Sequence, residues 1–140
     1  MLLQPVGATG RLDAARLLEH VTQLDRAALI ARGDEALPAE AVARFRALTE
    51  RRAAGEPVAY ITGSAGFFGR TFVVDGRVLV PRPESEHVVE AAVTDLRSRR
   101  KTAGMAVDVG TGSGALAITL ACELPELGVL ATDISSDALA

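Results

Sequence analysis

Apolar residues recur with a helical period over the first part of the chain. Within residues 11–24 they occupy positions i, i+3, i+4 and i+7, which predicts an amphipathic helix. Two more helices are predicted, over residues 26–32 and from Pro38 to Gly55. Three short helices bury only a small core, so we expect this part to lean on the segment that follows or on a partner.

The pattern then changes to short β-branched runs. Residues 71–74 and 77–80 are two such runs, and Asp75 and Gly76 separate them. Asp-Gly between two such runs is a strong hairpin signal, because both central residues of a type I′ turn need a positive φ. The sequence therefore predicts a β-hairpin at this place, most simply as a structural connector.

From Pro81 onward, helical and strand patterns alternate. The pattern predicts a helix to about Arg100, a buried strand over 105–109, a helix over 115–123 and a second strand over 127–132. This order predicts an α/β fold with parallel strands and right-handed crossovers. Two parallel strands alone do not make a stable doubly wound sheet, because both faces and both edges need covering. The sequence therefore looks like the front half of a larger enzyme.

A glycine-rich turn joins the first of these strands to the helix after it. The turn follows Asp108 and consists of Gly110, Thr111, Gly112, Ser113 and Gly114. Glycine lets a ligand approach the backbone closely, and the start of the next helix offers unpaired N–H groups. Asp133 lies at the end of the second strand, where a carboxylate can accept hydrogen bonds from both hydroxyls of a ribose. Together these features predict a site for a ribose-bearing cofactor.

The glycines alone leave two classes of cofactor open. From Gly110 to Ala115 the turn also fits a relaxed dinucleotide-binding fingerprint. Asp108 favours S-adenosylmethionine, because a carboxylate there complements a cationic ligand that carries an amino group and a sulfonium. The turn also begins after about 100 residues, whereas a dinucleotide fingerprint commonly opens its domain.

Four separated motifs carry a more specific resemblance. They are Arg51-Arg52-x-x-Gly55-Glu56-Pro57-x-x-Tyr60-Ile61-Thr62-Gly63, then Phe72-Val73-Val74, then Val80-Pro81-Arg82-Pro83-Glu84-Ser85-Glu86, and finally the glycine turn with Asp108 and Asp133. In this order they resemble the HemK/PrmC family, which are protein-(glutamine-N5) methyltransferases that act on peptide chain release factors.

The resemblance implies three parts. Residues 1–56 would be a helical substrate-recognition domain, residues 57–80 a β-hairpin linker, and residues 81–140 the first half of a class I (Rossmann-like) methyltransferase domain that uses S-adenosylmethionine. The turn from Gly110 to Gly114 would lie along the cofactor, and Asp133 would bind its ribose. The family's Asn-Pro-Pro-Tyr motif, which holds the target glutamine amide, does not occur in these 140 residues. No catalytic residue is therefore assigned, and the chain alone is expected to be inactive.

Three alternatives stay open. Sister enzymes that methylate a ribosomal-protein glutamine carry Pro-Arg-Ser-Pro where this chain has Pro81-Arg82-Pro83-Glu84, so the release-factor branch is favoured. A piece of a dinucleotide-binding oxidoreductase is disfavoured by Asp108 and by the same motif. A non-catalytic module that docks a release factor remains an open interpretation.

Other side chains carry less chemistry. His20 and His87 stand apart and form no cluster of metal ligands, so no metal site is predicted. Cys122 lies among apolar residues and is expected in the core. Arg82 and Glu84 either border the mouth of the site or cap the following helix, and the sequence does not decide between these roles.

Composition narrows the function classes further. The net charge of −3 disfavours a general nucleic-acid binder, which usually carries a clear positive excess. No apolar run approaches the roughly 18 residues of a membrane span, and no secretory signal is visible at the N-terminus. We therefore expect a cytoplasmic protein without direct contact to nucleic acid or membrane. The family resemblance implies a release factor as its partner, and its oligomeric state stays open.

Overall fold

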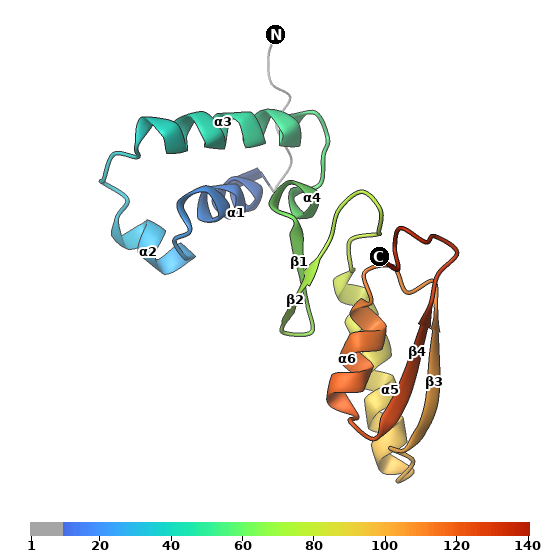
Figure 1. The fold of residues 1–140 in the computed structure, drawn as a ribbon. Helices are drawn as coiled ribbons and strands as arrows, with labels where there is room; N and C mark the ends of the chain where they lie inside the picture. Colours follow the sequence, from blue (N-terminus) through green and yellow to red (C-terminus); the bar gives the residue numbers. More distant parts are fainter. Residues whose placement is uncertain (1–9) are drawn as a thin grey trace. The chain divides into compact units, whose positions relative to one another are not determined.

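The structure, a computed structural model, describes residues 10–140, which form two compact units (Figure 1). The helical unit extends to Thr62, and the α/β unit runs from Gly63 to Ala140. The helical unit contains α1 (Gly10–Thr22), α2 (Arg26–Ala31), α3 (Ala39–Ala53) and α4 (Val58–Thr62). The α/β unit contains β1 (Ser64–Phe67), β2 (Arg70–Val73), the 3-10 turn η1 (Pro83–Ser85), α5 (Glu86–Ser98), β3 (Gly104–Val109), α6 (Ala115–Glu123) and β4 (Leu127–Thr132).

The helical unit has the three helices that the periodicity predicts, and α4 in addition. Asp25 is the N-cap of α2, since its Oδ1 accepts the N–H of Ala28 at 2.7 Å. Leu17 and Val21 of α1 are buried, whereas α3 has no fully buried residue. An ion pair between Arg52 Nε and Asp13 Oδ2, at 2.8 Å, joins α3 to α1. The small core confirms that these helices alone bury little apolar surface.

The β-hairpin lies earlier in the chain than the sequence predicts. β1 and β2 pair antiparallel, from Ser64 opposite Val73 to Phe67 opposite Arg70. The turn between them is Phe68-Gly69, with φ of 50° and 70°, so both central residues are left-handed as a type I′ turn requires.

The predicted hairpin around Asp75 and Gly76 is wrong. These residues form a turn in the loop after β2, where the N–H of Val78 donates to the carbonyl of Asp75 at 3.2 Å. The upstream pairing is preferred because it places Phe67 and Phe72 on one buried face, with their rings edge to face at 6.1 Å. Tertiary burial thus overrides the local turn signal.

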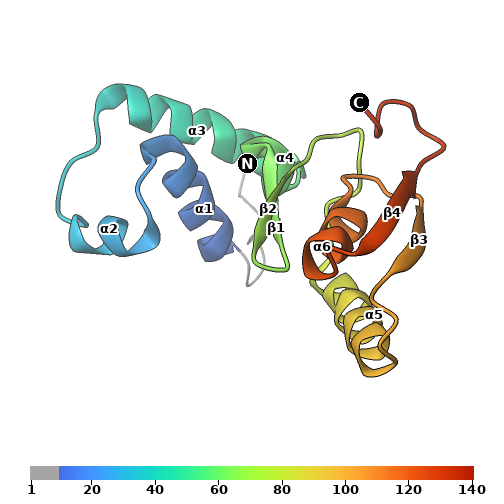
Figure 2. The same cartoon turned by 60° about the horizontal axis from the view of Figure 1, so that its bottom comes forward.

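In the α/β unit, β3 and β4 are parallel, from Gly104 opposite Leu127 to Val109 opposite Thr132, and α5 and α6 pack against one face of this sheet (Figure 1). The two strands run side by side in the second view as well (Figure 2). Val89 and Val93 of α5 share the core with the phenylalanines of the hairpin. The α/β character that the alternating pattern predicts is confirmed.

The opposite face of the sheet carries apolar side chains that no described residue buries. Met105, Val107 and Val109 alternate along β3 toward this face and are 73%, 57% and 83% exposed. The expectation of a fully buried first strand is therefore wrong, because the helices cover only one side. Cys122, expected in the core, is also exposed, since it lies on the outer side of α6.

The position of the hairpin can be tested by unfolding. Phe67→Leu should lower the free energy of unfolding of the α/β unit by on the order of 1 kcal/mol, because Phe67 is 1% exposed and packs in the core. Val73→Thr, on the paired strand but 80% exposed, should change it by less than about 0.5 kcal/mol. Urea titration followed by circular dichroism measures both; equal effects of the two substitutions would contradict the observed register.

Candidate functional site

The glycine-rich turn lies where β3 ends and α6 begins, as the sequence predicts. Gly112 and Gly114 have φ of 54° and 74°, in the left-handed region that disfavours side chains. A Cβ on Gly114 would also lie 3.0 Å from Cδ1 of Ile118, so the side chain of Ile118 would have to move to make room for it. The turn is closed by the N–H of Gly114, which donates to the carbonyl of Thr111 at 2.9 Å.

Two carboxylates hold the turn in place. Asp108 Oδ2 accepts the Thr111 hydroxyl at 2.8 Å, and Thr111 is buried. Asp133, at the end of β4, accepts the N–H of Gly112 on Oδ2 and the N–H of Ser135 on Oδ1, each at 2.9 Å. Because the strands are parallel, both carboxylates lie at the same edge of the sheet.

Asp133 is held in its ionised form. The N–H groups of Ser135 and Gly112 lower the pKa of its carboxyl below the ordinary value, because they stabilise the charged form. Each carboxylate oxygen accepts one of these N–H groups and keeps a lone pair for a further donor. A hydroxyl pair of a ribose is a donor set that fits such a carboxylate.

The loop that follows β2 forms a wall beside the turn. A Cβ on Gly112 would lie 4.0 Å from Cβ of Val78. A hollow of about 120 Å³ lies between the loop and the turn; it is lined by Leu79, Val80, Pro81, Arg82, Ser85, Gly110, Thr111, Gly112, Ser113, Ala115 and Leu116. Pro81 and Arg82 of the Pro-Arg-Pro-Glu motif therefore border the glycine turn, whereas Glu84 does not line this hollow.

A second hollow lies on the other side of the same loop. It measures about 200 Å³, and Asp75, Arg77, Ser113 and Asp137 are among its lining residues. Arg77 Nη2 pairs with Asp75 Oδ2 at 2.8 Å, and this hydrogen-bonded pair raises the pKa of Arg77, with a smaller contribution from Asp137. The loop is thus pinned by its own ion pair next to the start of α6.

The structure brings all the predicted site residues together at one sheet edge. The N–H of Gly112 donates directly to Asp133, and the N–H groups of Gly110 and Thr111 donate to the carbonyl of the preceding residue, Thr132, at 2.8 and 2.9 Å. Among residues 10–140, no group of three His, Cys, Asp or Glu side chains is placed to hold a metal ion. No helix in this described range is long and apolar enough to cross a membrane.

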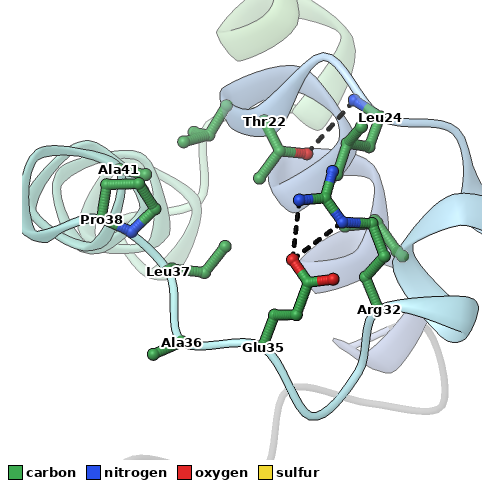
Figure 3. Close-up of a pocket in the computed structure, with 10 residues that line it drawn as sticks. Thr22, Leu24, Arg32, Glu35, Ala36, Leu37, Pro38 and Ala41 are labelled. Carbon is green, nitrogen blue, oxygen red and sulfur yellow. Dashed lines mark hydrogen bonds and ion pairs between the residues drawn. The ribbon is translucent and has the colours of Figure 1, made fainter.

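The helical unit has a separate pocket of about 330 Å³ (Figure 3). Apolar side chains from α1, α2 and the segment before α3 line it, among them Val21, Leu24, Leu29 and Leu37. Arg32 Nη2 pairs with Glu35 Oε2 at 2.7 Å beside these residues. The two charged residues among the described residues that line the pocket, Arg32 and Glu35, are paired with each other.

Comparison with known proteins agrees with the motifs. Residues 3–63 match the family model of the PrmC N-terminal domain. The chain is 46% identical over 129 residues to a release factor glutamine methyltransferase of Neisseria gonorrhoeae and 47% identical over 131 residues to one of Xylella fastidiosa, with 92% of this chain covered in both cases. A protein of the same name from Koribacter versatilis is 46% identical over 129 residues.

The matched region is 45–46% of the length of these relatives, so the chain spans about half of each. The family-model match covers the helical unit, and the longer matches extend through the glycine turn. The resemblance drawn from the four motifs is confirmed: residues 3–63 match the PrmC N-terminal domain, and the chain is similar over 92% of its length to proteins named release factor glutamine methyltransferase.

Proposed function

We propose that this chain belongs to an S-adenosylmethionine-dependent enzyme that methylates the side-chain amide of a glutamine in peptide chain release factors. The observation that carries the proposal is the ionised Asp133 carboxylate, which holds Gly112 of the glycine turn and keeps lone pairs for a ribose. The similarity over 92% of the chain to proteins named release factor glutamine methyltransferase supports the reaction and the substrate.

The cofactor would lie along the turn from Gly110 through Thr111, Gly112 and Ser113 to Gly114, with its ribose on Asp133. The bare backbone of the turn suits a ligand that approaches closely, and the parallel strands β3 and β4 fit the start of a class I (Rossmann-like) domain over residues 81–140. When bound, S-adenosylmethionine would supply an activated methyl group. The chain's own residues would hold and orient that cofactor.

The partner would be a release factor, and the enzyme would act on it in the cytoplasm. The helical unit, with residues 1–56 as its main part, would recognise this protein substrate. Its apolar pocket and the exposed Ile30 of α2 offer surface for protein contact. A dinucleotide-binding oxidoreductase is a weaker interpretation, because Asp108 places a carboxylate at the turn where such folds usually have an apolar residue.

Asp133→Ala tests the ribose contact. The substitution should weaken binding of S-adenosylhomocysteine roughly 5- to 100-fold, because hydroxyl donors lose a charged acceptor. Asp34→Ala is the control, since Asp34 is an exposed carboxylate of the helical unit outside the proposed site and its loss should leave affinity within about twofold. Isothermal titration calorimetry measures both; an unchanged dissociation constant for Asp133→Ala would remove this residue from the proposed site.

The pH dependence of binding tests the charge on Asp133. Its pKa is lowered in the folded state, so the carboxylate stays ionised as the pH falls to its ordinary value of about 4. The affinity advantage of the wild type over Asp133→Asn should therefore persist from pH 7 to about 5 and vanish only as the pH falls through the lowered pKa. Titrations at a series of pH values check this, and an advantage already lost between pH 7 and 6 would contradict it.

The 140-residue chain alone should not methylate a release factor. It carries the proposed cofactor turn but no Asn-Pro-Pro-Tyr motif to orient the amide, and a misplacement of about 1 Å can cost on the order of a hundredfold in rate. The measurement is transfer of labelled methyl groups to purified release factor, with a full-length release factor glutamine methyltransferase as the positive control. Turnover by the chain within about tenfold of that enzyme would overturn the expectation.

A further inference from the structure

Arg82 is the basic side chain that lines the hollow beside the glycine turn. It precedes η1, and its carbonyl accepts the N–H of Ser85 at 3.0 Å, but its side chain makes no cap hydrogen bond. Within residues 10–140 its guanidinium takes part in no hydrogen bond or ion pair. The capping role that the sequence leaves open is therefore not a role of this side chain.

Most other arginines of the α/β unit have a partner. Arg70 pairs with Glu123 at 2.9 Å, Arg77 with Asp75 at 2.8 Å, and Arg99 with Asp95 at 2.8 Å. These charges are used to hold loops and helix ends together. Arg82 differs because its side chain has no such partner within the described residues and because Arg82 lines the hollow next to the glycine turn.

The charges around the turn have opposite signs. Asp108 and Asp133 stand at the ends of β3 and β4 and bind the glycine turn, and Arg82 comes from the loop that lines the hollow together with that turn. An α-amino acid carries an ammonium and a carboxylate on the same carbon atom. Its ammonium is complementary to a carboxylate such as Asp108, and its carboxylate is complementary to a guanidinium, which binds carboxylates through two parallel hydrogen bonds.

The surroundings favour such an ion pair. Val80 and Pro81 are half-buried and line the same hollow, so a bound carboxylate would be partly withdrawn from water. Opposite charges attract more strongly in such a place than in bulk solvent. The hollow, about 120 Å³, is suited to a small polar head and not to a whole nucleoside.

We propose that Arg82 binds the carboxylate of an α-amino acid group on the ligand of the glycine turn. The inference rests on the proposed function, in which that group is the methionine end of the cofactor. Arg82 would then determine specificity: it would favour a cofactor that carries an amino acid over an adenosine derivative that lacks one.

Two ligands that share the adenosine and differ in the amino-acid part test this role. S-adenosylhomocysteine has the α-amino acid, and 5′-methylthioadenosine does not. Calorimetric titration of the wild-type chain should show tighter binding of S-adenosylhomocysteine. Arg82→Gln should weaken its binding by about tenfold or more and leave 5′-methylthioadenosine within about twofold, while Arg82→Lys should recover part of the loss.

Arg100→Gln is the matched control, because Arg100 is also exposed, its side chain also lacks a partner among the described residues, and it lies outside the hollow. It removes the same charge and should change neither affinity. An equal loss for both ligands, or no loss for S-adenosylhomocysteine, would overturn the role of Arg82 while the proposed function stands. Failure of the wild type to bind either ligand would instead refute the proposed function, and this inference with it.

Discussion

The hydrogen bond from the N–H of Gly112 to Asp133 is the contact on which the site depends. It joins the turn after β3 to the end of β4, so the two strand ends and the glycine turn become one rigid edge. The same carboxylate also accepts the N–H of Ser135 and thereby holds the segment that follows β4. The ionised carboxylate of Asp133 thus holds two backbone segments through hydrogen bonds and keeps lone pairs that could accept the hydroxyls of a ribose.

This edge needs support from residues far away in the sequence. The hairpin buries Phe67 and Phe72 against Val89 and Val93, which anchors the chain just before the loop that runs beside the turn. The ion pair between Asp75 and Arg77 then stiffens that loop. Packing of the hairpin in the core thus fixes the start of the loop that brings Pro81 and Arg82 beside the glycine turn.

The parallel sheet itself is supported on one side. α5 and α6 cover the face that contains Ala106 and Val129, while the face of Met105 and Val107 is exposed among the described residues. Parallel strands are normally covered on both faces. The stability of the α/β unit consequently depends on the one face of the parallel sheet that the helices cover. Phe67 lies in β1, outside that sheet, but it belongs to the core on the covered side.

Local sequence signals were sufficient wherever a structure follows from neighbouring residues. Periodicity and turn chemistry predict α1, α2 and α3, the cap at Asp25, the strands β3 and β4 and the glycine turn, and all are present. The approach of Asp133 to Gly112 was also predictable, because parallel strands end at the same edge of a sheet.

Only the tertiary structure decided strand pairing and burial, because these depend on which residues from distant parts of the sequence pack together. Residues 71–74 have a strong local signal to pair downstream, but residues 70–73 pair with β1, and this pairing buries Phe67 and Phe72 in one core. The exposure of β3 and of Cys122 likewise depends on which faces the helices cover. The position of Arg82 beside the turn follows from the same hairpin. The periodicity of the sequence indicates which residues prefer to be buried. Which other residues bury them depends on how the whole unit packs.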